Sequence, residues 1–298
     1  MIKEKKPEKI ILDFTYIEDV AYILDQIKAT GIPCVNQKDR DNQAEVLVHD
    51  VSQHPGDVTC QEPFLYITDD GIKAAEYKAE GKAVLVFLHE KNKGESFPKN
   101  RYFIEGFEDA DATYFTRIYQ REKKIPWTIG VTERLKIREM TLEDTDALYS
   151  LYQDKAVVEF MEDLPQNKEE EKAYITDYID KVYGFLGFGM WLAELRETGE
   201  VIGRVGFRNC EAETNSHCSA NESEDGNEPA GAESASVELG FMISPKYQSH
   251  GYAYEACRAA IDYMQEEYPE YKRIARCMRG NVKAIKLCHK LGIECRLF

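Results

Sequence analysis

The first 125 residues alternate between two kinds of segment, and this alternation constrains the fold more than any other feature. Five short runs are apolar and rich in β-branched residues: Lys9–Asp13, Gly31–Val35, Glu45–His49, Phe64–Thr68 and Ala83–Phe87. Between and after them lie segments with the apolar spacing of amphipathic helices: Ile17–Ala29, Gly71–Glu80 and Asp111–Glu122. This order is typical of parallel sheets with helices on both faces. It predicts a Rossmann-like, three-layer α/β domain over residues 1–125.

The rest of the chain follows a different pattern. Four strand-like runs occur here, at Leu135–Arg138, Met190–Leu195, Val201–Phe207 and Ser236–Ile243, with helical segments ending at Tyr152 and Tyr183. The turn residues of 196–199 join the second and third runs into a hairpin. Two domains agree with a length of 298 residues. We expect a linker at 126–132, beginning at Pro126, and a second domain at 133–298.

The formal net charge of −16 excludes one class of function. Unspecific nucleic-acid binding needs a basic face that neutralises phosphates, so we expect no nucleic-acid partner. A cationic or amine-bearing partner is compatible with this charge. The sequence has no apolar run of the roughly 20 residues that a membrane helix needs, and the N-terminus lacks a signal-peptide pattern. We therefore expect a cytoplasmic protein with no membrane partner.

Cysteine spacing and a local change of composition give two further expectations. The eight cysteines are scattered singly with no Cys-x-x-Cys pair, which predicts reduced thiols in the core and no metal site. Residues 210–235 contain seven acidic residues and neither Lys nor Arg. This composition predicts a disordered insertion between two strands.

The segment after this insertion has the order of an anion-binding site. The strand Ser236–Ile243 is followed by a short loop and by a helix that begins near Gly251, with one apolar face at positions 253, 256, 257, 260, 261 and 264. The first backbone N–H groups of a helix have no intrahelical acceptor, and the helix dipole favours negative charge there. Glycine at the helix start lets a phosphate approach the backbone closely. The segment is therefore a candidate phosphate site.

The residues of this loop carry a family resemblance. The pattern Gln248-x-x-Gly251-x-Ala253 resembles the pyrophosphate-binding motif of the GNAT acetyltransferases. The flanking stretch 237–256 is similar to the RimJ/RimL-like branch, which acetylates protein N-terminal amines. The stretch Arg279–Gly292 resembles a downstream helix of the same family. The resemblance implies an α+β, GNAT-type mixed-sheet fold for the second domain.

The same resemblance implies a function and a set of site residues. An acetyl group would pass directly from acetyl-CoA to a primary amine, either a protein N-terminus or a small amine. The implied cofactor contacts are Phe241, Met242 and Ile243 beside the pantetheine, opposite a strand at 272–277; Gln248, Ser249, His250, Gly251, Tyr252 and Ala253 around the pyrophosphate; and Asn281.

Two residues are implied for catalysis. Glu238 would be the general base that removes a proton from the amine. Cys288 occupies the position at which many relatives have a Tyr that protonates the departing CoA thiolate. Because that Tyr is absent, a non-catalytic CoA-binding protein is an alternative.

The first domain carries a second resemblance. Phe64–Val84, with Asp69 and Asp70 after its first strand, resembles the acidic fourth motif of haloacid-dehalogenase-like hydrolases, in which such acids hold Mg²⁺. Asp13 stands where that family has its nucleophile, but Thr15 replaces the second acid and no partner Lys is evident. We therefore expect an inactive hydrolase-like domain. The alternative is a Mg²⁺-dependent phosphohydrolase.

Overall fold

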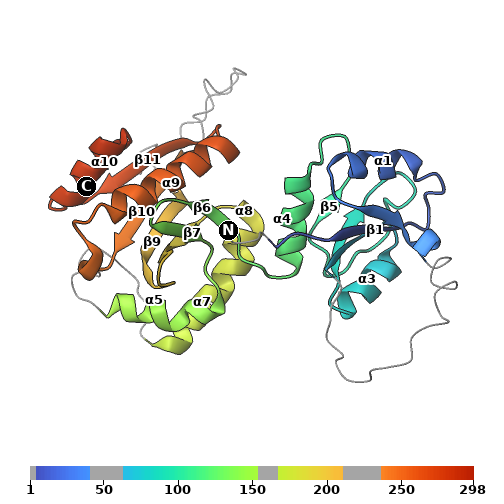
Figure 1. Ribbon diagram of the computed structural model, residues 1–298, viewed down its shortest axis with the longest axis horizontal. Coiled ribbons are helices and arrows are strands. Elements are labelled where there is room, and N and C mark those ends of the chain that lie inside the picture. The colour runs from blue at the N-terminus through green and yellow to red at the C-terminus, as the bar shows by residue number, and fades with distance from the viewer. Residues whose placement is uncertain (1–4, 41–62, 154–166, 211–235) are drawn as a thin grey trace, which may run out of the picture. The chain divides into compact units, whose positions relative to one another are not determined.

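The computed structural model describes residues 5–40, 63–153, 167–210 and 236–298. The chain divides into two compact units, Met1–Ile125 and Pro126–Phe298 (Figure 1). Each unit contains its own sheet and its own hydrophobic core. None of the helices in the described ranges combines the length and apolar character that crossing a membrane requires.

The first unit contains a five-stranded sheet in which every strand pair is parallel. Its order is β2-β1-β3-β4-β5, and its strands are β1 (Lys9–Asp13), β2 (Cys34–Asn36), β3 (Phe64–Thr68), β4 (Ala83–Phe87) and β5 (Phe103–Ile104). The helices are α1 (Ala21–Ala29), α3 (Gly71–Ala79) and α4 (Ala112–Glu122). The predicted parallel sheet is thereby confirmed. The strand expected at Glu45–His49 lies outside the described residues.

Strand β4 shows why helices cover both faces of this sheet. All five of its residues are buried, and successive side chains point to opposite faces. Leu85 packs in a core with residues of α1 and α4, whereas Val84 and Val86 pack against Ala74 of α3. A strand buried on both faces needs cover on both, which gives the predicted three layers.

The second unit contains a seven-stranded mixed sheet. Its order is β12-β11-β10-β9-β8-β7-β6, and its strands are β6 (Thr128–Val131), β7 (Leu135–Arg138), β8 (Met190–Leu195), β9 (Val201–Asn209), β10 (Ser236–Ile243), β11 (Lys272–Cys277) and β12 (Glu294–Leu297). The pairs β10–β11 and β11–β12 are parallel and the others antiparallel. This sheet confirms the mixed-sheet fold that the resemblance implied.

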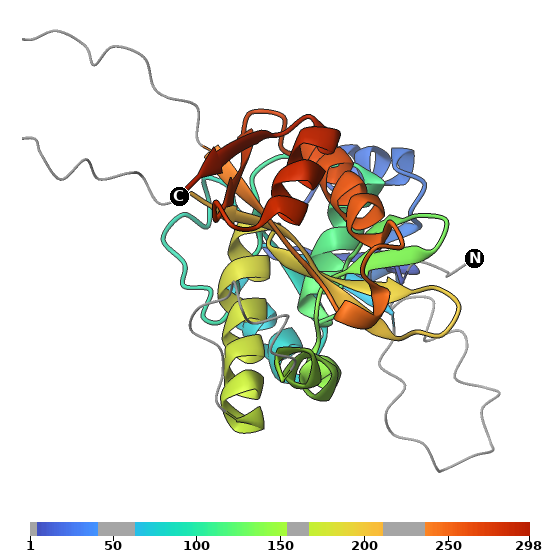
Figure 2. The same ribbon diagram turned by 90° about the vertical axis from the view of Figure 1, so that its left-hand side faces the viewer.

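Helices cover the two faces of this sheet (Figures 1 and 2). One face carries α9 (Tyr252–Glu267) and α10 (Val282–Leu291); the other carries α5 (Thr145–Tyr152) and α7 (Lys168–Tyr178), which continues into a π-helical turn (Ile179–Tyr183) and the short α8 (Gly184–Leu186). Single 3₁₀ turns, Leu142–Asp144 and Pro245–Tyr247, precede α5 and α9.

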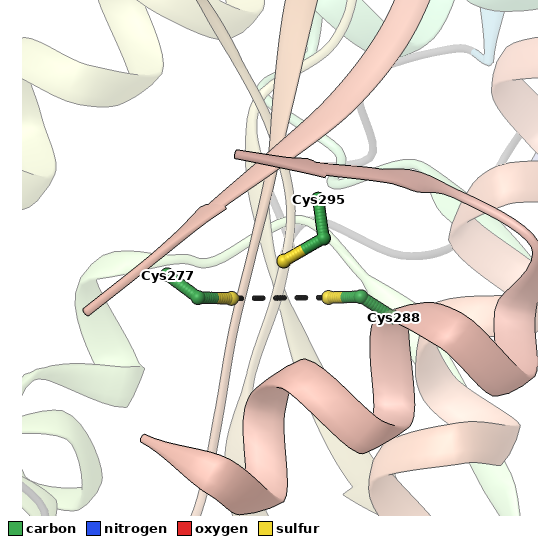
Figure 3. A group of neighbouring side chains, drawn as sticks. All are labelled: Cys277, Cys288 and Cys295. Carbon is green, nitrogen blue, oxygen red and sulfur yellow. Dashed lines mark hydrogen bonds between the residues drawn. The ribbon is translucent and has the colours of Figure 1, made fainter. Parts of the chain in front are cut away.

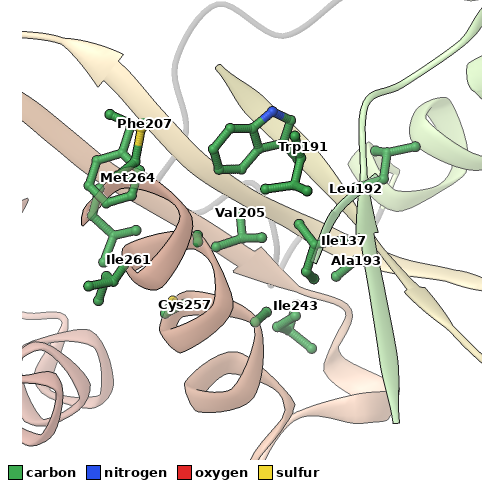
Figure 4. Close-up of a cluster of buried hydrophobic side chains, with 14 of the residues drawn as sticks. Ile137, Trp191, Leu192, Ala193, Val205, Phe207, Ile243, Cys257, Ile261 and Met264 are labelled. Carbon is green, nitrogen blue, oxygen red and sulfur yellow. The ribbon is translucent and has the colours of Figure 1, made fainter. Parts of the chain in front are cut away.

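Helix α9 forms the central contact of the second core. Its residues Ala256, Cys257, Ala260, Ile261 and Met264 are buried against the sheet (Figure 4). These are five of the six positions expected on its apolar face; the sixth, Ala253, is half-buried. The helix thereby sets the position of the loop that precedes it.

Two expectations about segment boundaries need correction. Residues 126–132, expected as a linker, contain β6, which pairs with β7. The reason is that Ile129 is buried in the core of the second unit, so this segment belongs to the sheet. The first helix begins at Ala21 rather than at Ile17. The insertion expected at 210–235 lies outside the described residues from 211 onward.

Replacing Gly203 by Ala should separate β9 from β10. Gly203 pairs with Ile243, and a Cβ added to Gly203 would lie 2.1 Å from the Met242 carbonyl oxygen. Because that oxygen belongs to the backbone of the paired strand, we expect the free energy of unfolding to fall by about 3 kcal/mol. Urea unfolding followed by tryptophan fluorescence measures this loss, since Trp127 and Trp191, the only tryptophans, lie in the second unit.

Gly280→Ala is the matched control. A Cβ at Gly280 meets no atom within 4 Å, so its free energy of unfolding should change by less than about 0.5 kcal/mol. Equal losses in the two variants would contradict the close approach of β9 and β10.

Candidate functional site

Strands β10 and β11 part from each other along their length. They pair only from Ser236 to Glu238, opposite 272–274. Beyond this point β10 stays on β9 as far as Ile243, while β11 pairs with β12 as far as Cys277. The facing edges of 239–243 and 275–277 therefore carry backbone groups without a strand partner. Such groups can bind an extended polar ligand laid between the strands.

The three residues expected beside the pantetheine lie on the free part of β10. Phe241 and Met242 are half-buried and Ile243 is buried. The Ile243 carbonyl oxygen accepts a hydrogen bond of 3.0 Å from Nε2 of Gln248. This bond ties the first residue of the loop to the end of the strand.

The loop 248–253 has the backbone geometry of an anion site. Ser249 and Gly251 adopt left-handed conformations, with φ of 63° and 86°, and α9 begins at Tyr252 with no side chain capping it. The backbone N–H groups from Ser249 to Tyr254 donate to no acceptor within the described residues. A run of unpaired N–H groups at the start of a 16-residue helix favours a phosphate.

A salt bridge that sequence reasoning missed holds this loop in place. Glu255, in the first turn of α9, accepts hydrogen bonds from the Thr132 hydroxyl (2.5 Å), from the Arg134 backbone N–H (2.9 Å) and from Arg134 Nε (2.8 Å). Arg134 Nη1 also donates to the His250 carbonyl oxygen at 3.0 Å, and the guanidinium lies 4.2 Å from the Tyr252 ring centre. The β6–β7 turn is thereby fixed to the phosphate loop.

These contacts change the ionisation of Glu255. Partial burial by itself would raise its pKa, but the hydrogen bonds from Thr132 and Arg134 outweigh burial and lower the pKa. The carboxylate is therefore ionised at neutral pH. Its charge is balanced by Arg134, so the loop beside it can still accept an anion.

Glu238, the expected base, is enclosed by two arginines. Its side chain is buried, Oε1 accepts from Arg208 Nη2 and Oε2 accepts from Arg276 Nε, both at 2.8 Å. Both carboxylate oxygens are thus engaged by guanidinium groups, in short charge-assisted hydrogen bonds.

Asn281 and Cys288 lie on the last helix. The Asn281 side chain caps α10 by accepting from the Ala284 backbone N–H at 3.1 Å. Cys288 is buried, and its Sγ lies 3.9 Å from Sγ of Cys277. Burial raises the pKa of the Cys288 thiol to about 11, so it is protonated at neutral pH. Its sulfur points toward Cys277 and Cys295 (Figure 3).

A second buried carboxylate lies on the face of the sheet that α5 and α7 cover, which is also the face of Glu238. Glu171 of α7 has no exposed surface, and neither of its oxygens has a hydrogen-bond partner among the residues that the structure describes. Burial raises its pKa, and the positive charge of Arg204 acts in the opposite direction. Sequence reasoning missed this residue because it follows two other glutamates, and a run of acids in a first helical turn normally indicates a solvated surface.

Arg204 supplies the positive charge that acts on Glu171. It lies on β9 directly opposite Met242. Its guanidinium is buried and donates to the Tyr152 hydroxyl at 2.5 Å, while Nε has no partner within the described ranges of the chain. The side of the sheet next to α5 and α7 therefore contains unsatisfied polar atoms of both charges beneath the free part of β10.

The acidic residues of the first unit form a cluster at the carboxyl ends of β1 and β3. Lys73 Nζ lies 2.6 Å from Asp13 Oδ1, and the Tyr77 hydroxyl donates to Asp13 Oδ2. Asp69 accepts from the backbone N–H of Thr15 at 2.6 Å with Oδ1, and its Oδ2 is engaged as well. Lys73 is a partner for Asp13 that sequence reasoning missed.

Asp70 lies beside a cavity of about 720 Å³ in the same unit. Its Oδ1 caps α3 by accepting from the Ile72 and Lys73 backbone N–H groups, at 2.8 and 3.1 Å. Burial would raise the pKa of Asp70, but these bonds and one from Thr15 lower it. The lining includes Tyr16, Gly71, Ile72, Glu95 and Pro98.

The second unit is similar to known acetyltransferases. Residues 134–294 match the model of the acetyltransferase (GNAT) domain. The uncharacterised protein YkkB of Bacillus subtilis is 27% identical over 166 residues, which cover 55% of this chain and 84% of that protein. The uncharacterised N-acetyltransferase YnaD of Bacillus subtilis is 25% identical over 167 residues, which cover 55% of this chain and 81% of that protein.

Among solved structures, the ribosomal L7/L12 α-N-protein acetyltransferase RimL, in complex with coenzyme A, is similar to this chain. The match covers 55% of this chain and 82% of that structure, with 16% identity and a TM-score of 0.42.

The salt bridge of Glu255 should stabilise the second unit in a pH-dependent way. Its folded-state pKa lies below the unfolded value of about 4.3, so the stabilisation is present above that pH and is lost as the pH falls through the folded pKa. We expect Glu255→Gln to cost about 1–2 kcal/mol at pH 7, a value reduced because Arg134 is 40% exposed. Urea unfolding between pH 7 and pH 3 measures the difference.

Glu266→Gln, at an exposed position of the same helix, is the control. Its free energy of unfolding should differ little from that of the unsubstituted chain at any pH in this range. A constant difference for Glu255→Gln across this pH range would show that the carboxylate charge is not what fixes the loop.

Proposed function

Because the chain belongs to the acetyltransferase (GNAT) family, we propose that its second unit transfers the acetyl group of acetyl-CoA directly to a primary amine. The amine is that of a protein N-terminus or of a small molecule. One observation carries this proposal: the unpaired N–H groups of 249–254 follow directly on the free edge of β10. A ligand with an extended amide arm and a pyrophosphate fits both features together.

Each part of acetyl-CoA has a place in this arrangement. The pyrophosphate binds to the backbone N–H groups of Ser249 to Ala253, with Gln248 holding the loop to β10. The pantetheine arm lies along 241–243 and faces β11. Asn281, at the start of α10, contacts the cofactor near this arm. Backbone N–H groups at the free strand edge polarise the thioester carbonyl and stabilise the oxyanion that forms on attack.

The acceptor amine approaches from the α5 and α7 side of the sheet. The other face is closed, because α9 packs on β9 and β10 and α10 packs on β11. On the α5 and α7 side lie Arg204, Tyr152 and Glu171, all of them buried. A cationic amine offers hydrogen-bond donors to the Glu171 carboxylate, which otherwise has none.

Glu171 is the better candidate for the general base. An alkylammonium ion must lose a proton before its nitrogen can attack the thioester carbon. Burial raises the pKa of Glu171, and its oxygens are not engaged by other described side chains, whereas both oxygens of Glu238 are already engaged by guanidinium groups. Glu238, the base expected from the sequence, then orders β9, β10 and β11 through Arg208 and Arg276.

The reaction closes with one proton transfer. The amine nitrogen bonds to the acetyl carbon, the carbon–sulfur bond breaks, and the CoA thiolate takes a proton from a nearby donor. The Cys288 thiol is protonated at neutral pH and can serve, although its sulfur contacts Cys277. Water is the other donor.

For the first unit we propose a scaffold or recognition role rather than phosphate hydrolysis. A hydrolase of the haloacid-dehalogenase type needs a carboxylate free to attack phosphorus and others free to hold Mg²⁺. Both oxygens of Asp13 and of Asp69 are instead engaged by side chains or backbone N–H groups of the unit itself. The cluster therefore supports the loss of this activity.

Gly251→Ala should weaken acetyl-CoA binding. The residue has φ of 86°, and its backbone N–H belongs to the unpaired run, so a Cβ both strains the loop and obstructs the phosphate. We expect the dissociation constant, measured by calorimetry on the full chain, to rise at least about tenfold, which equals about 1.4 kcal/mol.

Gly292→Ala is a matched control for this substitution. Gly292 has φ of 71° at the end of α10, and a Cβ there meets no atom within 4 Å, so it carries similar strain away from the loop. Its affinity for acetyl-CoA should not change. Unaltered binding by Gly251→Ala would overturn the assignment of the loop, and binding without turnover of any amine would favour a non-catalytic CoA-binding protein.

Glu171→Gln should lower kcat about 100-fold or more without lowering stability or the affinity for acetyl-CoA. Stability is preserved because the folded pKa is raised: the ionised carboxylate costs free energy above the unfolded pKa, and Gln removes that cost. The assay follows release of the CoA thiol with peptides, polyamines and aminoglycosides as acceptors, together with thermal unfolding.

Glu169→Gln, one exposed position in the same helical turn, is the control and should retain full activity. If Glu238→Gln removed more activity than Glu171→Gln, while both variants stayed folded, the base expected from the sequence would be the correct one.

A further inference from the structure

Three cysteines that are well separated in the sequence meet in the second unit. Cys277 ends β11, Cys288 lies in the middle of α10 and Cys295 lies on β12. Their sulfur atoms all lie within 4.8 Å of one another, and they point inward from three elements (Figure 3). No other group of His, Cys, Asp or Glu side chains in the described part of the chain has this geometry. The cluster is named the Cys triad below.

The spacing of the sulfurs fits a metal ion. Zn²⁺ binds thiolates at about 2.3 Å, so two sulfurs on one ion lie about 3.8 Å apart in tetrahedral geometry and about 4.0 Å apart in trigonal geometry. The sulfurs of Cys277 and Cys288 are 3.9 Å apart. The remaining sulfur pairs need to close by less than about 1 Å, which side-chain rotation on one edge strand supplies.

The local chemistry favours a thiophilic ion over other ligands. Cys277 and Cys288 are buried and Cys295 is half-buried, so two donors are shielded from water and the third faces the route of entry. Soft thiolate ligands select Zn²⁺ or Cu⁺ over hard cations such as Mg²⁺ and Ca²⁺. A separation of 3.9 Å is far from the roughly 2.05 Å of a disulfide bond.

We propose that the Cys triad binds one thiophilic metal ion, with Cys277, Cys288 and Cys295 as thiolate ligands and a solvent molecule as the remaining ligand. Binding releases the thiol protons, so affinity rises with pH. Metal binding does not depend on the proposed acetyl transfer, and with Cys288 bound to the ion, water is the proton donor in that reaction.

The consequence of binding is structural. Strand β12 lies at the edge of the sheet and pairs only with β11, and the Cys triad joins both strands to α10. An ion held there adds a bonded connection between three elements that otherwise meet through strand hydrogen bonds and apolar side chains. It therefore stabilises the end of the sheet in proportion to its own affinity.

The test uses the full chain, freed of metal with a chelator and kept reduced. Zn²⁺ titration by calorimetry should show one site, and Co²⁺ should give the thiolate-to-metal charge-transfer absorption of a sulfur-bound ion. Cu⁺ is titrated separately to decide which ion the site prefers. Zn²⁺ should also raise the melting temperature. Cys295→Ser, at the half-buried position, should lower the Zn²⁺ affinity at least about tenfold while the chain stays folded.

Cys210→Ser is the matched control, because Cys210 is also half-buried in the second unit but lies outside the Cys triad. It should bind Zn²⁺ like the unsubstituted chain. The proposal is overturned if the reduced chain binds none of these ions, if Cys295→Ser binds them with unchanged affinity, or if the absorption of the Co²⁺ form lacks the sulfur band. Cys288→Ser tests a buried ligand in the same way: its Zn²⁺ affinity should also fall, and circular dichroism checks that the variant is folded.

Discussion

The parting of β10 from β11 is the constraint on which the rest of the second unit depends. Strand β10 is held to β9 from Val237 to Ile243, and glycine at 203 lets the two backbones approach closely. Strand β11 is held instead by β12 and by α10. Two parallel strands held on opposite sides share only three residue pairs. The same separation leaves backbone groups of β10 without a strand partner. After Ile243 the chain leaves the sheet and forms the loop that precedes α9.

The anion site at loop 248–253 depends on backbone dipoles more than on charged side chains. The anion meets backbone N–H groups and the dipole of α9, while Arg134 is already engaged by Glu255 and serves mainly to fix the loop. Such a site keeps its geometry without a cluster of lysines, which is consistent with a chain of net charge −16. The buried charged groups on the face covered by α5 and α7 lack complete hydrogen bonding. Glu171 and Arg204 are both incompletely satisfied, and unsatisfied buried groups cost free energy unless a ligand pairs with them.

The sequence predicted what depends on local pattern and missed what depends on tertiary contact. The apolar faces of β4 and α9 follow from periodicity alone, and the strand–loop–helix order located 248–253. Sequence patterns could not show that Glu255 meets Arg134, 121 residues earlier, because each alone is an ordinary surface charge. Lys73 was missed beside Asp13 for the same reason. The Cys triad escaped notice because its members are spaced by the lengths of a helix and a turn rather than by the short spacing of a zinc motif.

The cofactor site and the Cys triad share one structural element, and this connects their energetics. Strand β11 forms one wall of the opening between β10 and β11, and its last residue, Cys277, belongs to the Cys triad. Asn281 follows four residues later and caps α10, the helix that carries Cys288. An ion that fixes Cys277 against Cys288 also fixes the wall and the cap, so less freedom is lost when a cofactor arm settles between the strands. Ordering at the edge of the sheet thus lowers the entropic cost of binding at its centre.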